Sequence, residues 1–260
     1  DLVFSGVKYF NFNKKKIWLN DCLEKYDIPY IASNRAALDN ESNKNVAKKL
    51  ILKAKIKTAD FFVTSPDEHQ SETSIPISFP LFIKPVKGGD SRGIDSNSVA
   101  YNFSSFKKKV LEIKDEHNLS SLVETYLPGK EYSVGIFQDS ISGTLRAMPI
   151  EIIIKKNKNG HSILDFKVKK DDEEKVIMVS DSKIFNKLSK LAIKAFKALG
   201  GKSLGRIDIK MNHRGVPHFM EANLMPGLRE GYFYRSCLLN LDMNYEDMIF
   251  NIANTGLSSN

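Results

Sequence analysis

The stretch LGRIDIKMNHRGVPHFMEANLMPGL, residues 204–228, decides how this chain folds. Residues 204–211 alternate as a strand does, residues 212–215 form a turn, and residues 216–223 return with further strand-forming side chains. Side chains of the same parity lie on one face of such a hairpin. The pattern therefore predicts one polar face drawn from both strands: Asp208, Glu221 and Asn223.

These three side chains are hard oxygen donors, the type of ligand that Mg²⁺ prefers. Arg206 precedes Asp208 by two residues, so we expect it on the same face. A metal ion beside an arginine suits phosphate chemistry, because the ion offsets the charge of a nucleotide and the guanidinium stabilises a developing oxyanion. A merely solvated acidic face is the alternative that the hairpin alone leaves open.

The residues that follow the hairpin favour a metal site over a solvated acidic face. Together they give the pattern R-x-D…E-x-N-x-x-P-G, which ends at Gly227. This pattern resembles the metal-binding end of the ATP-grasp ligases, and most closely that of the D-alanine–D-alanine ligase family. Further motifs of that family occur in the same order over about residues 20–255.

The resemblance implies an α/β (α+β) fold in which two subdomains clasp ATP. By the same resemblance, residues 1–40 are the remnant of an α/β N-terminal domain. Residues 41–122 are the small ATP-grasp subdomain, and residues 123–260 are the large subdomain with the metal site. The family has several dozen residues before the position that Asp1 matches, so we expect a shortened N-terminal part here.

Composition excludes several classes of protein. The chain is 42% hydrophobic and 27% charged, and it has no run of about 18 apolar residues of the kind that spans a membrane. Its start is not a signal peptide, and Cys22 and Cys237 are expected to be reduced thiols of a cytoplasmic protein. The net charge of +8 comes from dispersed lysines without interleaved aromatics, so no nucleic-acid partner is expected.

Hydrophobic periodicity predicts alternating strands and helices, which favours α/β or α+β. The predicted strands are residues 1–4, 28–31, 79–85, 122–126, 132–137 and 144–154, besides the hairpin. The predicted helices are residues 17–26, 43–55, 104–118, 181–200 and 244–254, with loops at 65–78 and 155–162.

Lys84 stands out in the apolar strand of residues 79–85, because a buried ammonium needs a partner. The sequence VKGGDSRGI follows at residues 86–94. Glycine-rich loops let backbone N–H groups approach phosphates closely. A lysine on a strand followed by a flexible loop therefore predicts a phosphate clamp.

The resemblance gives this loop a more definite role. It matches the family's phosphate-covering loop, in which Gly89 lies, and Ser91 matches a serine over the transferred group. Lys44, at the start of a predicted helix, matches a lysine that reaches the phosphates. A solvated lysine is an equally good interpretation of Lys44.

The segment ETYLPGKE, which begins at Glu124, resembles the family's hinge between the two subdomains. The resemblance implies that Glu124 accepts a hydrogen bond from the adenine amino group. It also implies that the backbone at Tyr126 and Leu127 binds the adenine edge. Glu131 would bind the ribose hydroxyls, since a carboxylate can accept from both, and Met220 would pack on the base.

Residues 163–170 resemble an acidic-aromatic-x-x-Lys pattern whose lysine binds phosphate. Lys169 is the match, although Lys167 and Lys170 compete with it. The family has a tyrosine next, on a flap over the site, where this chain has Lys170 and the acidic run 171–174. The flap is therefore expected to close differently.

At the acceptor end, Arg206 and the backbone near Gly227 would contact the reacting carbonyl oxygen. Tyr232 stands where the D-alanine ligases have a serine that holds the carboxylate of the second substrate. A larger or differently charged acceptor is one interpretation of Tyr232. Simple packing beneath the turn is the other.

The implied function is an ATP-dependent ligase that joins two amino acids through an acyl phosphate, as a D-alanine–D-alanine ligase does. The implied cofactors are ATP and one or two Mg²⁺ ions, with Mn²⁺ as a substitute. The partners are small amino-acid or carboxylate substrates, and a homodimer is one possible assembly. Two alternatives stay open: a ligase for another carboxylate–amine pair, and a nucleotide-binding module that has lost catalysis.

Overall fold

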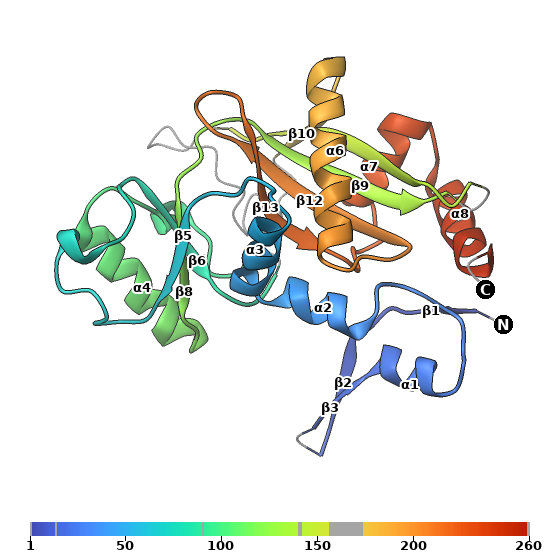
Figure 1. Ribbon diagram of the computed structural model, residues 1–260, viewed down its shortest axis with the longest axis horizontal. Coiled ribbons are helices and arrows are strands. Elements are labelled where there is room, and N and C mark those ends of the chain that lie inside the picture. Colours follow the sequence, from blue (N-terminus) through green and yellow to red (C-terminus); the bar gives the residue numbers. More distant parts are fainter. Residues whose placement is uncertain (1, 14, 90, 140–141, 156–173, 259–260) are drawn as a thin grey trace.

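The structure is a computed structural model that describes residues 2–13, 15–89, 91–139, 142–155 and 174–258. It is a mixed α/β fold built around two separate sheets, with a smaller N-terminal part beside them (Figure 1). The fold class predicted from the sequence is confirmed. The domain boundaries predicted after residues 40 and 122 remain a prediction.

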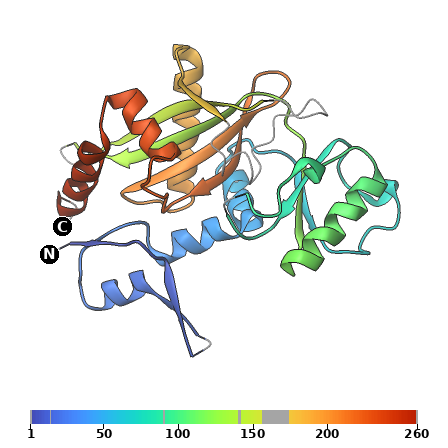
Figure 2. The same cartoon turned by 180° about the vertical axis from the view of Figure 1, so that it is seen from behind.

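The larger sheet has five antiparallel strands in the order β11-β10-β9-β12-β13. Helices α6 and α7 cover its two faces, as the views from opposite sides show (Figures 1 and 2). These elements are β9 (Glu131–Gln138), β10 (Leu145–Ile153), β11 (Lys175–Met178), α6 (Ser182–Ala198), β12 (Leu204–Met211), β13 (Pro217–Asn223) and α7 (Tyr232–Leu241).

Alternation along β12 divides its side chains between a core and a site. Ile207 and Ile209 are fully buried in the cluster that α6 completes. Arg206, Asp208 and Lys210 therefore lie on the opposite face. The predicted hairpin is confirmed, because Asp208 pairs with Glu221 and Arg206 with Asn223 across the two strands.

A β-bulge interrupts this hairpin next to the polar pair. Asp208 pairs with Glu221, but the next residue, Ile209, pairs with Phe219, which leaves Met220 as the extra residue. A bulge shifts the alternation of one strand by one residue. Phe219 can therefore join the apolar core while Glu221 shares the polar face of Asp208.

The smaller sheet has four antiparallel strands in the order β5-β8-β6-β7, with helix α4 on one face. Leu81 and Ile83 of β6 pack in the cluster against α4. Phe82 and Lys84 therefore lie on the other face. The elements are β5 (Phe61–Thr64), β6 (Leu81–Pro85), β7 (Val99–Ala100), α4 (Phe103–His117), β8 (Ser121–Thr125) and the short 3-10 helices η1 (Glu72–Ser74) and η2 (Ser96–Ser98).

The remaining elements form the N-terminal part and the links to the sheets. Strands β1 and β4 are parallel, β2 and β3 form a hairpin, and α8 packs near β4. The elements are β1 (Val3–Phe4), β2 (Tyr9–Phe12), β3 (Lys15–Trp18), α1 (Leu19–Lys25), β4 (Tyr30–Ile31), α2 (Arg35–Ser42), α3 (Lys44–Lys53) and α8 (Tyr245–Ser258).

Several segments differ from the sequence prediction. The helix predicted from residue 17 begins at Leu19, because Lys15–Trp18 pairs with β2. Helix α2 and strand β5 were not predicted. The Asn34 side chain accepts from the backbone N–H of Ala37 at 3.0 Å, which starts α2, and Asn43 starts α3 directly after it.

Gly129 lies where the hinge segment contacts β12, and this contact predicts a loss of stability on substitution. A Cβ at Gly129 would lie 2.6 Å from both the Cβ and the carbonyl oxygen of Met211. The Gly129 N–H donates to that oxygen at 3.0 Å. Gly129→Ala is therefore expected to lower the free energy of unfolding by about 1–3 kcal/mol. Urea denaturation measures this, and Gly6→Ala, with no atom within 4 Å of its Cβ, is the control.

The two cysteines are free thiols in different environments. Cys237 on α7 is 1% exposed among apolar side chains, and burial raises the pKa of its thiol to about 12. The thiol therefore stays neutral well above pH 8. We expect a thiol-specific reagent at pH 8 to modify only Cys22, which is partly exposed, in the native chain and both residues in denaturant. Two rapidly modified thiols in the native chain would contradict the buried placement of Cys237.

Candidate functional site

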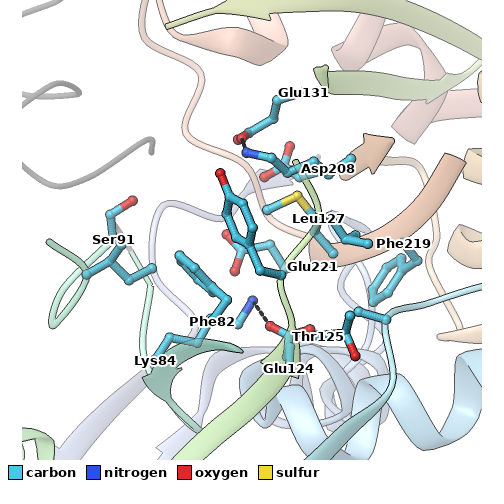
Figure 3. A pocket seen from close by; sticks show the side chains of 15 residues that line it. Phe82, Lys84, Ser91, Glu124, Thr125, Leu127, Glu131, Asp208, Phe219 and Glu221 are labelled. Atoms are coloured by element: carbon cyan, nitrogen blue, oxygen red, sulfur yellow. Dashed lines mark hydrogen bonds and ion pairs between the residues drawn. The ribbon is translucent and has the colours of Figure 1, made fainter. Parts of the chain in front are cut away.

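A pocket with about 730 Å³ of empty space, including its open mouth, lies between the two sheets. Its lining combines apolar and charged side chains, as the sites of small-molecule ligands do. Figure 3 shows residues of both sheets around it, with Lys84 and Glu124 from the small sheet and Asp208, Glu131 and Glu221 from the large one. The lining residues are Ala59, Phe82, Lys84, Ser91, Ile94, Glu124, Thr125, Tyr126, Leu127, Glu131, Asp208, Lys210, Phe219, Met220 and Glu221.

Lys84 has the partner that its burial requires. Its Nζ lies 2.8 Å from Glu124 Oε2, and the two side chains are 2% and 7% exposed. Burial lowers the pKa of Lys84, but the carboxylates of Glu124 and Glu221 outweigh this effect, so the net pKa is raised. Lys84 is therefore cationic at neutral pH.

A second buried lysine, which the sequence did not single out, contacts the same carboxylate. Lys48 of α3 pairs with Glu124 Oε1, so each oxygen of Glu124 has its own ammonium group. Burial raises the pKa of Glu124, but the two lysines more than offset this effect, so the pKa is lowered. The carboxylate is therefore ionised, whereas burial lowers the pKa of Lys48 despite its contact with Glu124.

Asp208, on the opposite wall, is paired with Arg206, which does not itself line the pocket. Arg206 donates from Nε and Nη2 to the two oxygens of Asp208, each at 3.0 Å, and Ser133 Oγ donates to Asp208 Oδ1 at 2.7 Å. Burial lowers the pKa of the Arg206 guanidinium, but Asp208 outweighs this effect and the pKa is raised. Arg206 therefore stays charged, and the aspartate is fixed in orientation.

Glu131 and Lys210 form a further ion pair in the pocket lining, with Lys210 Nζ 2.8 Å from Glu131 Oε2. The strand register explains the pair, because Lys210 of β12 lies opposite Glu131 of β9. Lys210 was not predicted as a site residue. Its signal in the sequence is its parity with Asp208, two residues earlier on the same strand.

Two of the three predicted metal ligands line the pocket. Asp208 and Glu221 lie opposite each other in the hairpin and both line the pocket. Asn223 does not line it, and its Oδ1 accepts from the Met225 N–H at 3.2 Å. No cluster of three His, Cys, Asp or Glu residues suited to a metal occurs in the described part of the chain. The two carboxylates and the amide oxygen still fit Mg²⁺ by donor type.

The glycine-rich loop reaches the pocket through Ser91. This residue is 9% exposed, lines the pocket and has a φ of 56°, in the left-handed region. Gly89 is not among the lining residues. Lys44 Nζ donates to the Gly88 carbonyl at 2.6 Å, so Lys44 holds the loop to the start of α3. Neither of the two sequence interpretations of Lys44 included this contact.

The hinge and the bulge supply the apolar part of the pocket. Tyr126, Leu127 and Met220, which the resemblance assigns to the adenine base, all line the pocket. Phe82 and Phe219 add two aromatic side chains that were not predicted. For Phe82 the signal in the sequence was its position two residues before Lys84, on the same face of the strand.

The predicted acceptor residues lie outside this pocket. Gly227 lines a second cavity with about 670 Å³ of empty space, next to Ser5, Gly6 and Leu224. The Tyr232 ring packs over Arg206, with 5.5 Å between its centroid and the guanidinium carbon, and its hydroxyl donates to Glu174 at 2.7 Å. Burial raises the pKa of Tyr232. Lys169 falls outside the described residues.

Comparison with known proteins places this architecture in a family. The family described as D-ala D-ala ligase C-terminus matches residues 50–254. D-alanine–D-alanine ligase A of Bacillus cereus is 25% identical over 238 residues, which are 90% of this chain and 74% of that protein. The Aquifex aeolicus ligase is 29% identical over 213 residues, 80% and 67% of the two chains.

Solved structures agree on the fold. The crystal structure of D-alanine–D-alanine ligase from Bacillus anthracis complexed with ATP matches with a TM-score of 0.73 and 22% identity, over 93% of this chain and 74% of that one. VanG D-Ala:D-Ser ligase from Enterococcus faecalis also gives 0.73, at 19% identity over 92% and 68%. The chain belongs to the D-ala D-ala ligase C-terminus family, and the ATP-grasp resemblance is confirmed.

Among the described residues, no helix has both the length and the apolar character needed to cross a membrane.

Proposed function

We propose that this protein is an ATP-dependent ligase that joins the carboxylate of one amino acid to the amine of another through an acyl phosphate. The observation that carries the proposal is the pocket between the sheets, with a cationic lysine on one wall and two carboxylates opposite each other on the other. Membership of the D-ala D-ala ligase C-terminus family supports it.

ATP occupies the pocket in this proposal. Phe82, Met220 and Leu127 surround the base with apolar side chains, and Glu124 accepts from its amino group. Glu131 accepts from the ribose hydroxyls. The relative from Bacillus anthracis, whose crystal structure is described as complexed with ATP, supports a nucleotide in this fold.

The phosphates of ATP lie toward Lys84 and the glycine-rich loop. Lys84 binds them as a fixed cation, and Ser91 lies over the transferred group. Lys44 supports the loop through Gly88, and we also assign a phosphate contact to Lys169. Asp208, Glu221 and Asn223 would hold Mg²⁺, which when bound supplies neutralising charge for phosphoryl transfer.

The proposed reaction has two steps, phosphoryl transfer and amide formation. A substrate carboxylate oxygen attacks the γ-phosphorus of ATP, ADP leaves, and an acyl phosphate forms. The neutral amine nitrogen of the second amino acid attacks the carbonyl carbon, the C–O bond to phosphate breaks, and inorganic phosphate leaves while the nitrogen releases one proton to the phosphate or to water, so that an amide bond forms. Arg206 and the backbone near Gly227 stabilise the negative charge on the carbonyl oxygen in the second step.

Phosphate release from Mg-ATP tests the reaction, with D- and L-amino acids supplied singly and in pairs. Release that requires D-alanine, together with formation of the dipeptide, is the expected result. ATP binding without release for any amino acid would overturn the amino-acid ligase. It would favour another substrate pair, or a nucleotide-binding module without catalysis.

A different acceptor is a second candidate, which the environment of Tyr232 favours. Its hydroxyl is hydrogen-bonded to Glu174 and its ring covers Arg206, so the acceptor end has a bulky side chain beside a carboxylate. VanG, a D-Ala:D-Ser ligase by name, shows that relatives of this fold differ in acceptor. Release of phosphate with D-alanine plus a second, different amino acid would support this candidate.

A further inference from the structure

We propose that Lys48, which does not line the pocket, is a positioning residue that fixes Glu124 for selection of the purine base. The inference rests on the proposed binding of ATP in the pocket between the sheets. It adds a residue to base recognition that no sequence motif indicates.

Lys48 is completely buried, and its hydrogen-bond and ion-pair partners connect it to the pocket. Its Nζ contacts Glu124 Oε1 and Thr58 Oγ1, and Thr58 Oγ1 donates to the Phe219 carbonyl at 2.8 Å. Glu124 and Phe219 both line the pocket, whereas Lys48 and Thr58 do not. Lys48 therefore lies outside the pocket and reaches its lining directly at Glu124 and through Thr58 at Phe219.

Two lysines restrain the Glu124 carboxylate where one would leave it free to rotate. Lys84 holds Oε2 and Lys48 holds Oε1, so both ends of the group are fixed. An ionised carboxylate offers about four lone-pair sites, so accepting from two lysines leaves about two for a ligand. Glu124 can then only accept a hydrogen bond, and its direction is set by its two neighbours.

An acceptor held in this way discriminates between purines. Adenine carries an amino group at C6, which donates, whereas hypoxanthine carries a carbonyl oxygen, which a carboxylate repels. A site built around a buried polar group rejects a ligand that cannot satisfy that group. Without Lys48, Glu124 can turn toward Lys84, and the preference for adenine is expected to fall.

Lys48 also fixes Glu124 relative to the larger sheet. Helix α3 packs against β13 and α6, while Glu124 belongs to β8 of the smaller sheet. Thr58 forms a parallel bridge with Phe219, whose N–H donates to the Lys57 carbonyl at 2.9 Å. The Lys48 ammonium thus joins the two walls of the pocket at the end where Glu124 lies.

The test is calorimetric titration of the whole chain with ATP and with inosine triphosphate. We expect Lys48→Met to weaken ATP binding about tenfold and inosine triphosphate binding by less than about threefold, so that the ratio of the two affinities falls. Lys49→Met, at the exposed neighbouring lysine on α3, should leave both affinities unchanged.

The Glu124→Gln variant tests whether Lys48 acts on nucleotide affinity through Glu124. If Lys48 acts through Glu124, adding Lys48→Met to Glu124→Gln should cause little further change in the affinity ratio, because interacting residues are not additive. A fully additive double variant would overturn the proposal. So would a Lys48→Met protein that is less heat-stable yet keeps the wild-type ratio, because that is the behaviour of a purely structural residue.

Thr58→Val covers the case in which Lys48→Met fails to fold. It keeps the shape of the side chain but removes one partner of Lys48, and a smaller fall in the ratio is expected. An unchanged ratio in a folded Thr58→Val protein would contradict the proposal. Failure of the wild-type chain to bind either nucleotide would instead overturn the proposed function, and the inference with it.

Discussion

Glu221→Gln is expected to abolish Mg²⁺-dependent ATP turnover while the fold stays intact. The substitution keeps the shape of the side chain and removes one of the two carboxylates that lie opposite each other in the hairpin. Because Mg²⁺ prefers charged oxygen ligands, its binding should weaken strongly. Loss of a partner outside the ligand shell costs about 10–100-fold, so loss of a ligand should reduce turnover by on the order of 100-fold or more.

The measurement is steady-state phosphate release over a range of Mg²⁺ concentrations, with the melting temperature recorded beside it. Glu230→Gln makes the same chemical change at an exposed residue and should leave turnover unchanged. Turnover that excess Mg²⁺ restores would support the assignment. A fully active Glu221→Gln protein would show that Glu221 is not a metal ligand.

Lys84→Met is expected to weaken ATP binding by about 10-fold or more, since hydrogen bonds to charged groups contribute about 1.5–3 kcal/mol. Lys84 is buried beside the pocket and stays cationic because Glu124 and Glu221 raise its pKa. A raised pKa means that the charge is fully present below the ordinary lysine value and is lost only above it. The affinity attributable to Lys84 should therefore be constant between pH 6 and pH 9.

Isothermal titration of the folded variant with ATP provides the check. Lys48 still contacts Glu124 in this variant, so the carboxylate is not left without a partner. Lys108→Met, at an exposed lysine of α4, is the matched control. Equal affinity of wild type and Lys84→Met would rule out Lys84 as the phosphate clamp.

The hairpin could be predicted from the sequence because the residues that determine it are close together along the chain. Alternation with a period of two assigns each residue to a face, and the turn at residues 212–215 fixes the pairing. The direct pairing of Asp208 with Glu221 depends in addition on the bulge at Met220. The bulge at Met220 was not predicted, since it depends on Phe219 entering a core formed by distant elements.

The partners of buried charges could not be predicted in the same way. The sequence shows that Lys84 needs a partner, but the partner, Glu124, lies forty residues away and becomes adjacent only when β6 pairs with β8. Lys48 and Lys49 are adjacent lysines with the same neighbouring residues, so the local sequence does not show which of them is buried. Only the packing of α3 on β13 buries the first and exposes the second.

Local patterns that are weak in apolar residues were missed for another reason. Helix α2 buries few side chains, chiefly Ala37 and Leu38, so its periodicity is faint. Its strongest signal is the Asn34 cap. The hairpin of β2 and β3 leaves all four side chains of β2 exposed, so burial does not select its pattern.

The bulge at Met220 has a consequence for how this chain can change in evolution. Losing or gaining one residue in the turn at 212–215 alters a surface loop, and surface loops tolerate changes of length. The same event beside Met220 would move either Phe219 out of the core or Glu221 away from Asp208. We therefore expect the length of the chain from Phe219 to Asn223 to be far more constrained among its descendants than the identity of the side chain at 220.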